Sequence, residues 1–358
     1  PASSVFLFAS VFLFIGIILF KSTGIKDSHV KRRLDTNIKK SFIDFFRDRD
    51  TYALVSGQAW RYWWRESCAK NENWILSPIT KVGSNQSVTE ANPFKYEDDD
   101  VFGYMNAQGE TYTRISPLKN SILVSVSPVK LFDEFCAFSR GDSQGSGIYQ
   151  RQSYSAIMKG MFSIDLDQVG TFTSMNRSGY QNISDKTKKE LLKDEKNKIV
   201  TDLIDKNIER VRLSRETRAK RVSEVLKALK TISGGAKLTT NYNSVKPDFI
   251  ILAIFKGGNN PFDNIAVDEK GESKISIEAI KESIEDNHEY LKSAIYIGID
   301  KGFMDEFDIG KLTNGTNKLN IDEKNNVDIH FGSVNKMIDQ FVDENIEKII
   351  QEMDDETV

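Results

Sequence analysis

Aromatic and basic residues gather in one short stretch near position 60, and this stretch is where the sequence first suggests chemistry. Residues 54 to 68 read LVSGQAWRYWWRESC. Ser56 is a favoured helix-capping residue, so we expect a helix to begin there, with Arg61 and Arg65 four residues apart on one face. These two guanidinium groups could bind phosphate, and a plain solvated face is the alternative. Trp60, Trp63 and Trp64 lie on a second face, and we expect this face to pack against the body of the protein.

A pair of glycines follows the end of a predicted helix near residue 232. Gly234 and Gly235 are suited to end the helix and to let the backbone approach another group closely. Lys237 could add a phosphate contact, but the signal is weak, because neither a Walker loop nor a dinucleotide-binding loop has this spacing. A buried strand, DFIILAIF, is expected just downstream, at residues 248 to 255.

The acidic run at residues 97 to 100, EDDD, raises the question of a metal site. Consecutive carboxylates point in different directions, no EF-hand spacing surrounds them, and no histidine accompanies them. We therefore expect surface charge at this run, with no metal and no cofactor.

The remaining reactive residues form no catalytic constellation. His29, His288 and His330 are scattered, and none has a serine or cysteine nearby that would suggest a nucleophile and base. Cys68 and Cys136 show no disulfide or zinc spacing, which favours a reducing compartment.

Two helical segments are expected to frame the second half of the chain. Residues 184 to 232 carry an apolar stripe at helical spacing, and residues 334 to 353 form an amphipathic helix that should dock on the body of the protein. A charge run on a helix usually marks a solvated face, and this is the expectation for the basic cluster within the first segment. That cluster is Arg210, Arg212, Arg215, Arg218, Lys220 and Arg221.

Strand signals occupy three further places. We expect strands within residues 121 to 130 and along a long stretch from residue 155, and a helix followed by a strand over residues 274 to 303. Between the first two strands, SRGDSQGSG at residues 139 to 147 is typical of a flexible loop or the tip of a hairpin.

The first twenty residues carry no charge and leave two interpretations open. Their apolar run, followed by lysines and arginines, fits a membrane anchor with a cytoplasmic flank. The same richness in valine, isoleucine and phenylalanine fits a buried first strand. No basic residues precede the run, which argues against a secretory signal peptide.

Composition excludes several classes of protein. With 358 residues, 39% of them hydrophobic and 28% charged, the chain fits one elaborated globular domain or two, rather than a disordered or multi-spanning protein. The net charge of -3 means that any nucleic-acid binding must depend on local patches.

Four segments in one order resemble a known family: residues 52 to 65, 89 to 105, 151 to 172 and 233 to 262. They are similar to the DevR-type branch of the RAMP superfamily, the repeated backbone subunit of type I CRISPR-Cas surveillance complexes, and most like type I-B. The resemblance covers roughly residues 50 to 310.

This resemblance implies an α+β fold, a modified RRM-like (ferredoxin-like) palm with an antiparallel sheet, helical finger insertions and a thumb hairpin. Residues 1–20 would be the first palm strand or a membrane anchor, and the family's lack of anchors favours the strand and a cytoplasmic location. Residues 21–116 would form palm with finger insertions, residues 117–150 the thumb, and residues 151–358 palm, a helical insertion and the C-terminal helix.

The resemblance also assigns RNA contacts. In the family, the helix that begins with a Ser-x-Gln-x-x-Arg pattern and a later glycine-rich loop face RNA. The matching positions are Ser56, Gln58, Arg61, Arg65, Gly234, Gly235, Ala236 and Lys237. A sequence-neutral channel needs donors to phosphate and few base contacts, so we add Arg151 and Gln152, which have suitable donors.

The implied function is a non-catalytic subunit that polymerises along the CRISPR RNA spacer, holds it independently of sequence and presents it to a target DNA strand. Further copies of this chain, the RAMP subunit that caps the 5' handle, and large and small subunits would be its partners. Two alternatives stay open. One is a ribonuclease of the same superfamily using thumb aspartates, Asp133 or Asp142, and the other is a membrane-anchored scaffold.

Overall fold

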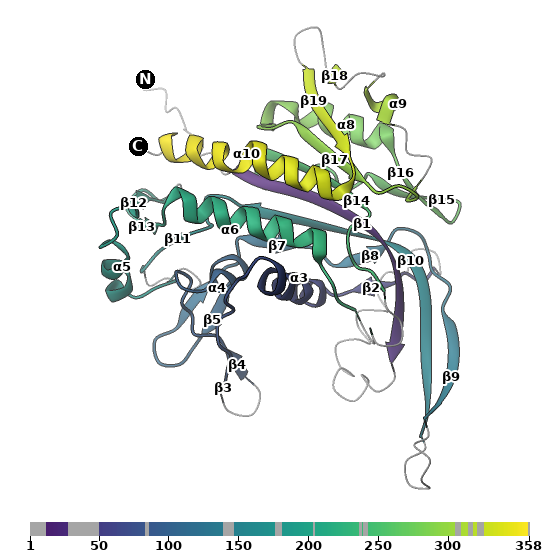
Figure 1. The fold of residues 1–358 in the computed structure, drawn as a ribbon, viewed down its shortest axis with the longest axis horizontal. Helices are drawn as coiled ribbons and strands as arrows, with labels where there is room; N and C mark the ends of the chain where they lie inside the picture. Colours follow the sequence, from purple (N-terminus) through teal and green to yellow (C-terminus); the bar gives the residue numbers. More distant parts are fainter. Residues whose placement is uncertain are drawn as a thin grey trace, which may run out of the picture.

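The first strand lies in the middle of the main sheet (Figure 1). The structure, a computed structural model, describes residues 12–27, 50–82, 86–138, 147–175, 181–202, 205–235, 238, 243–304, 309–313, 318–320 and 326–356. Strand β1 (Phe12–Asp27) pairs antiparallel with β10 (Gly147–Asp165) on one side and with β14 (Phe249–Lys256) on the other. The strand interpretation of the apolar run is therefore confirmed from Phe12 onward, and residues 1–11 lie outside the described part. Among the described residues, no helix has the length and apolar character needed to cross a membrane.

Within the described residues the sheet has ten strands and is mainly antiparallel, which together with the helices makes the fold α+β. Its order is β18-β19-β17-β14-β1-β10-β8-β2, and β7 and β9 also pair with β10. Only β17 and β19 run parallel in this order. The RRM-like palm stays a prediction. The other strands are β2 (Leu54–Val55), β7 (Leu118–Asn120), β8 (Leu123–Ser125), β9 (Phe132–Phe138), β17 (Ile295–Ile299), β18 (Lys318–Asn320) and β19 (Asn326–Gly332).

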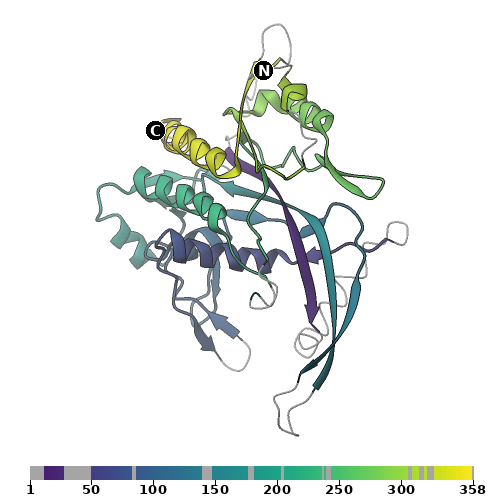
Figure 2. The same cartoon turned by 45° about the vertical axis from the view of Figure 1, so that its right-hand side comes forward.

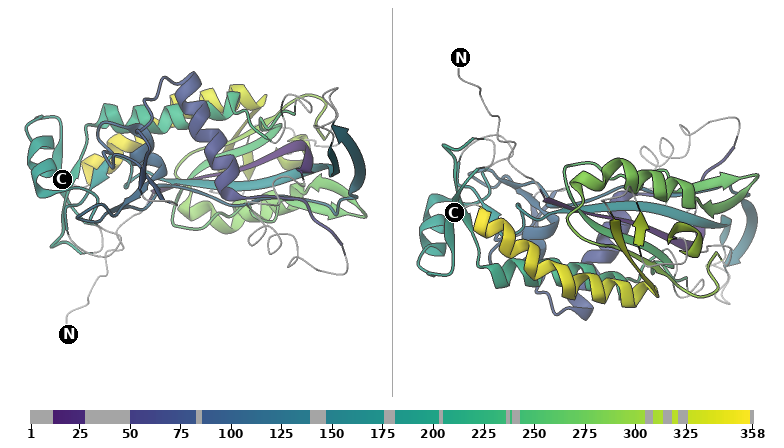
Figure 3. Two further views of the ribbon diagram at one scale, coloured as in Figure 1. Left: turned by 90° about the horizontal axis from the view of Figure 1, so that it is seen from below. Right: turned by 90° about the horizontal axis from the view of Figure 1, so that it is seen from above.

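Helices cover both faces of the sheet, as Figure 3 shows. Successive side chains of β14 point to opposite faces, so Ile250 and Leu252 join the core beneath α3, α6 and α10, while Ile251 and Ala253 join the core beneath α8. This explains why residues 249 to 255 of the strand are all apolar. The helices are α3 (Gly57–Asn71), α6 (Arg215–Lys227), α8 (Ile277–Asn287), α9 (Ile309–Thr313) and α10 (Val334–Glu356), with short 3-10 turns at Ala228–Thr231 and His288–Tyr290.

The C-terminal helix α10 docks on the body, as its sequence pattern predicts. It packs along α6 and β17, and its apolar stripe is buried. The buried residues are Val334, Met337, Ile338, Phe341, Val342, Ile346, Ile349, Ile350 and Met353.

A group of small elements extends from the body near α3. It contains two hairpins, β3–β4 and β5–β6, the short helix α4, and a three-stranded sheet of order β11-β13-β12 with α5 beside it. The bounds are β3 (Thr80–Val82), β4 (Gln86–Val88), α4 (Glu97–Phe102), β5 (Tyr104–Asn106), β6 (Tyr112–Arg114), β11 (Thr171–Phe172), α5 (Asp185–Leu191), β12 (Lys198–Thr201) and β13 (Glu209–Arg212).

The prediction of one long helical stretch over residues 184 to 232 is wrong. Only its two ends are helical, in α5 and α6, and β12 and β13 pair between them. Side chains of Asp202 and Asp205 accept backbone N–H bonds in the turn between the strands, and Ser214 caps a new helix by accepting from the Thr217 N–H. These local bonds compete with a continuous helix.

A long hairpin projects from the sheet, as Figures 1 and 2 show. It is made by β9 and the first part of β10, paired from Phe132 with Ser153 to Phe138 with Gly147. Of the loop or tip predicted at residues 139 to 147, all but Gly147 lies outside the described residues, and the strands that flank it pair as a hairpin requires. The assignment of residues 117–150 to a thumb stays a prediction, and this hairpin is the element that fits it. A two-stranded hairpin of β15 (Ala266–Glu269) and β16 (Glu272–Ile275) lies near its foot.

Candidate nucleic-acid interface

Helix α3 begins where the sequence predicts. Ser56 is its N-cap, and the serine hydroxyl accepts a hydrogen bond of 3.2 Å from the Ala59 N–H. Gln58, in the first turn, is exposed. The predicted contact helix thus presents one hydroxyl and one amide at its exposed start.

The aromatic face of α3 anchors the helix to the body, as predicted. Trp60 and Trp64 are 1% and 0% exposed, and their rings stack with centroids 5.5 Å apart. Each indole N–H donates a 2.7 Å bond to a backbone carbonyl, from Trp60 to Ser121 and from Trp64 to Val225. Both rings are therefore buried without leaving an indole N–H unpaired.

Arg61 serves the interior rather than the surface. Its guanidinium lies 5.0 Å from the centre of the Phe102 ring, and burial lowers its pKa to about 10. One terminal nitrogen donates to the Leu118 carbonyl and to the Asn120 side chain, both at 2.8 Å. The other donates to the Phe102 carbonyl at 2.8 Å and to the Ser116 hydroxyl.

Arg65 pairs with a buried carboxylate. Its Nε donates to Asp98 Oδ2 at 2.8 Å, a second nitrogen donates to the same oxygen, and Asp98 also accepts from the Ser77 N–H at 2.9 Å. The side chain of Asp98 is 2% exposed. The guanidinium groups of Arg61 and Arg65 are therefore engaged by the protein, because the arginine face of α3 lies against α4 and the residues around β7. Their assignment as RNA contacts stays a prediction.

The acidic run forms α4 and supplies counterions to buried arginines, so the expectation of surface charge is also wrong. Asp100 is fully buried, forms ion pairs with Arg114 and with Arg221 (2.5 Å), and accepts from the Gly170 N–H at 2.9 Å. Asp99 accepts from the Asn92 N–H at 2.9 Å, and burial raises its pKa. In the part of the chain that the structure describes, no group of three or more potential metal-ligating side chains could hold a metal ion.

The basic cluster of the supposed long helix is largely buried as well. Asp167 pairs with Arg210 (3.0 Å) and Arg212, and Asp354 of α10 pairs with Arg212 (3.2 Å) and Arg218 (2.6 Å). The solvated-face expectation fails for these residues, because only Arg215 and Lys220 keep substantial exposure. Together with the ion pairs of Asp100, these residues form one buried group, which we call the arginine core. It consists of Arg114, Arg210, Arg212, Arg218 and Arg221, with Asp100, Asp167 and Asp354.

The glycine loop meets α3 directly. Gly234 is buried, and a Cβ added to it would lie 2.1 Å from Cγ of Trp63. Gly235 has φ +117°, a backbone conformation that favours glycine. The close approach predicted for the backbone of this loop is thus made to the ring of Trp63. Ala236 and Lys237 lie outside the described residues.

Arg151 and Gln152 lie on the projecting hairpin, apart from α3. In β10 they pair with Glu134 and Asp133 of β9, and nothing is described of their side chains. Phe162, which contacts Trp64 edge-on, lies eleven positions further along β10, on the order of 30 Å away at about 3.3 Å per residue. The structure joins α3 and the glycine loop but not these two residues. Asp133 is exposed on β9, and Asp142 lies outside the described residues.

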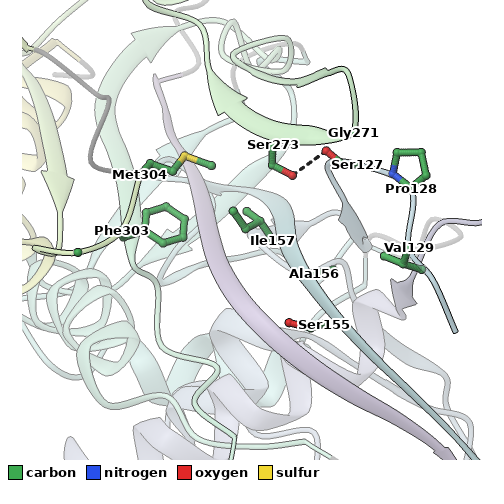
Figure 4. Close-up of a pocket in the computed structure, with 11 residues that line it drawn as sticks. Ser127, Pro128, Val129, Ser155, Ala156, Ile157, Gly271, Ser273, Phe303 and Met304 are labelled. Atoms are coloured by element: carbon green, nitrogen blue, oxygen red, sulfur yellow. Dashed lines mark hydrogen bonds between the residues drawn. The ribbon is translucent and has the colours of Figure 1, made fainter. Parts of the chain in front are cut away.

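A groove of about 340 Å³ lies at the foot of the hairpin, as Figure 4 shows. It is lined by β10, by the segment after β8, by the β15–β16 hairpin and by the turn after β17, which supplies Phe303 and Met304. Ser127 and Ser273 hydrogen-bond across it at 2.8 Å. Its described lining carries no charged side chain, so it offers hydroxyl and apolar contacts rather than ion pairs to phosphate.

The exposed strip of α3 carries a residue that sequence reasoning missed. Tyr62 is 54% exposed and lies between the exposed Gln58 and Lys70, with Glu66 one turn after it; these four residues are the outer face of α3. On a helical wheel Tyr62 lies between the direction of Arg65 and that of Trp63. A wheel centred opposite the tryptophans would have identified it.

Comparison with protein families decides the affiliation of the chain. Residues 32–274 match the family described as CRISPR-associated negative auto-regulator DevR/Csa2. The chain belongs to this family. The DevR/Csa2 match includes every candidate RNA-contacting residue, from Ser56 to Lys237, whereas β1, β17 and α10 lie outside it.

Solved structures give weaker likenesses to this DevR/Csa2 chain. One, described as "CRISPR RNA-guided surveillance complex, pre-nicking", has 11% identity and a TM-score of 0.48, covering 93% of this chain and 99% of that chain. Another, described as "CRISPR RNA-guided surveillance complex", has 13% identity and a TM-score of 0.44, covering 93% and 98%. No curated protein matches the sequence.

Proposed function

We propose that this chain is a backbone subunit of a CRISPR RNA-guided surveillance complex, of type I-B. The observation that carries the proposal is the family match over residues 32–274, which includes α3, the projecting hairpin and the glycine loop. The subunit polymerises along the spacer of the CRISPR RNA and presents it to a target DNA strand. Its partners are further copies of itself, the subunit that caps the 5' handle, and large and small subunits.

The contact chemistry on the surface supports binding that ignores base sequence. Ser56 and Gln58 present a hydroxyl and an amide at the start of α3, and the glycine loop brings backbone to the same helix. Such groups suit phosphate and ribose, which are the same at every nucleotide. Because Arg61 and Arg65 are engaged internally, the cations of the proposed channel are Arg151 and Lys237.

The subunit acts, in this proposal, without catalysis. Two buried carboxylates near α3, those of Asp98 and Asp100, hold arginines rather than facing a substrate. The alternative is cleavage of RNA by Asp133 or Asp142, and an RNA cleavage assay that compares the parent chain with the Asp133→Ala, Asp142→Ala variant tests it.

The decisive experiment is to co-express the chain with a CRISPR array and its neighbouring genes, purify the particle and sequence the retained nucleic acid. Spacer-containing RNA of one dominant length, in a particle with several copies of the chain, is the expected result. A stable particle without RNA, or one that retains only duplex DNA, would overturn the proposal.

The cation assignment has its own test. Arg151→Ala with Lys237→Ala should weaken binding of all guide RNAs about equally and reduce the salt dependence of binding, because two phosphate contacts are lost. Lys220→Ala is the matched control, since Lys220 is exposed on α6 and pairs with Glu224 at 3.7 Å. Equal effects of the control and the double variant would contradict the assignment.

A further inference from the structure

Tyr62 occupies the middle of the outer face of α3, and the residues on either side of it contact the rest of the protein. On one side, Arg61 and Arg65 are bound to the protein, and on the other Trp63 lies against Gly234. The side chain of Tyr62 is 54% exposed between these two contacts, and its ring is the large aromatic surface that α3 leaves to a ligand.

The ring of Tyr62 is held in place by its own helix. The hydroxyl donates a 2.6 Å bond to Glu66 Oε1, and Lys70 donates to the other oxygen of Glu66 at 3.3 Å. The bond between Tyr62 and Glu66 raises the pKa of the phenol and lowers that of the carboxyl. A ring fixed at its hydroxyl loses little freedom when a flat group packs on its face.

Charge at this position selects the kind of ligand. The Glu66 carboxylate contacts the Tyr62 hydroxyl and is paired with Lys70, so the charges beside the ring already have partners on the helix. An uncharged planar group suits the neutral face of the ring, and the exposed amide of Gln58 one turn earlier can hydrogen-bond to it. A nucleobase has both properties.

Two projecting hairpins flank α3 and would border a strand of RNA that crosses it. Figures 1 and 2 show the β3–β4 and β9–β10 hairpins extending past α3 in the same direction, one at each side. We propose that Tyr62 is a stacking platform for one base of single-stranded RNA, an inference that rests on the proposed function. Stacking is tolerant of base identity, because every base has an aromatic face, so it suits a guide whose sequence varies.

Substitution at Tyr62 separates stacking from phosphate binding. With the full chain and a mixed-sequence, unstructured RNA of about 30 nucleotides as the probe, Tyr62→Ala should raise Kd about tenfold at every salt concentration. The slope of log Kd against log salt should not change, since no phosphate contact is removed. Tyr62→Phe, which keeps the ring, should bind within about twofold of the parent chain. Fluorescence anisotropy measures all three.

A second tyrosine provides the control. Tyr112 of β6 also donates its hydroxyl to a glutamate, Glu110, so Tyr112→Ala removes a similar surface pair away from α3. It should leave Kd unchanged. Photocrosslinking of 5-iodouridine-substituted RNA, read by mass spectrometry, should place a crosslink on Tyr62 and none on Tyr112.

Several outcomes overturn the inference. The inference fails if the Tyr62→Ala chain binds RNA as tightly as the parent. It also fails if Tyr62→Phe loses as much affinity as Tyr62→Ala, or if Tyr62→Ala lowers the slope of log Kd against log salt. Loss of self-association with unchanged RNA affinity would make Tyr62 a protein contact instead. If the parent chain binds no single-stranded RNA, the proposed function fails and takes this inference with it. Equal thermal midpoints of parent and variants confirm that each chain is folded.

Discussion

The arginine core and the outer face of α3 use charge in opposite ways. In the core, Arg218 is fully buried and pairs with Asp354 at 2.6 Å, and Asp100 pairs with two further arginines. On the outer face, Tyr62 and Gln58 are exposed and uncharged. The arginines that look most like a phosphate site in the sequence therefore have partners within the protein, whereas the outer face of α3 combines two neutral residues with the ion pair of Glu66 and Lys70.

The difference has an energetic reason. A buried guanidinium is costly unless carboxylates and carbonyls satisfy its five donors, and once satisfied it has little left to offer a ligand. Arg61 illustrates this, since four acceptors of the protein already surround it. The number of arginines in a segment is thus a poor guide to phosphate binding until the partner of each one is known.

The largest expected effect comes from removing a counterion of the arginine core. Asp100→Asn leaves Arg114 and Arg221 without their shared negative charge, and should lower the free energy of unfolding by about 3–5 kcal/mol. Urea unfolding followed by fluorescence measures it. Asp99→Asn is the matched control, because burial already raises the pKa of Asp99 and favours its neutral form. We expect a loss below about 1 kcal/mol there, and equal losses would contradict the assignment of roles.

Arg65 tests the boundary between the two regions. Arg65→Ala should lower the free energy of unfolding by about 3 kcal/mol, because Asp98 stays buried without its cation, and Arg65→Ala with Asp98→Ala should lose less than the sum of the single variants. The salt dependence of RNA binding should not change. An Arg65→Ala chain of unaltered stability but reduced salt slope would instead make this guanidinium a phosphate ligand.

The contact of the glycine loop with α3 predicts a smaller effect. Gly234→Ala would place a methyl group against the ring of Trp63, so we expect a loss of about 1–3 kcal/mol in the free energy of unfolding, with a change in tryptophan emission. At Gly258 a Cβ would meet nothing within 4 Å, and Gly258→Ala should stay within about 0.5 kcal/mol of the parent. Similar losses for both variants would show that the Trp63 contact is not responsible.

The smallest effect concerns a carboxylate next to the arginine core. Burial, followed by repulsion from Asp167, raises the pKa of Asp165 from 3.8 to about 6. The folded state therefore holds this proton more tightly than the unfolded chain, and the contribution of Asp165 to stability is lost as pH rises from about 4 through 6. Asp165→Asn should increase the free energy of unfolding at pH 7 by about 1–2 kcal/mol and flatten its change between pH 4 and 6. Unfolding curves at several pH values decide; a variant with the parent's pH profile would refute the role of Asp165.

Sequence patterns predicted the parts of the fold that depend on a single element. The cap at Ser56, the buried tryptophans, the apolar strand β14 and the docked helix α10 all follow from local spacing. The N-terminal run stayed ambiguous from sequence, because an anchor and a strand buried on both faces have the same composition. Only its pairing with β10 and β14 distinguishes them.

Features that depend on distant partners were beyond sequence reasoning. Arg218 and Asp354 are far apart in the chain, and no local pattern indicates that they pair. The same holds for Arg65 with Asp98 and for Gly234 with Trp63. The β12–β13 hairpin was missed because isolated isoleucines and valines at mixed spacing fit a helix as well as two short strands. The predicted helix α3 exists, but its role as an RNA interface stays a prediction, and the partners of its arginines follow from tertiary pairing.

The central position of β1 has a consequence for the order in which the chain is made. Phe12 pairs with Lys256 and Leu19 with Phe249, so this strand has one of its two neighbours only after the ribosome has passed residue 249. Until then one edge of a long, apolar strand is unpaired, and such edges promote association between chains. Pairings this distant in sequence are also slow to form. Production of the subunit in a cell therefore depends on how well that first strand is shielded while the rest of the sheet is still being translated.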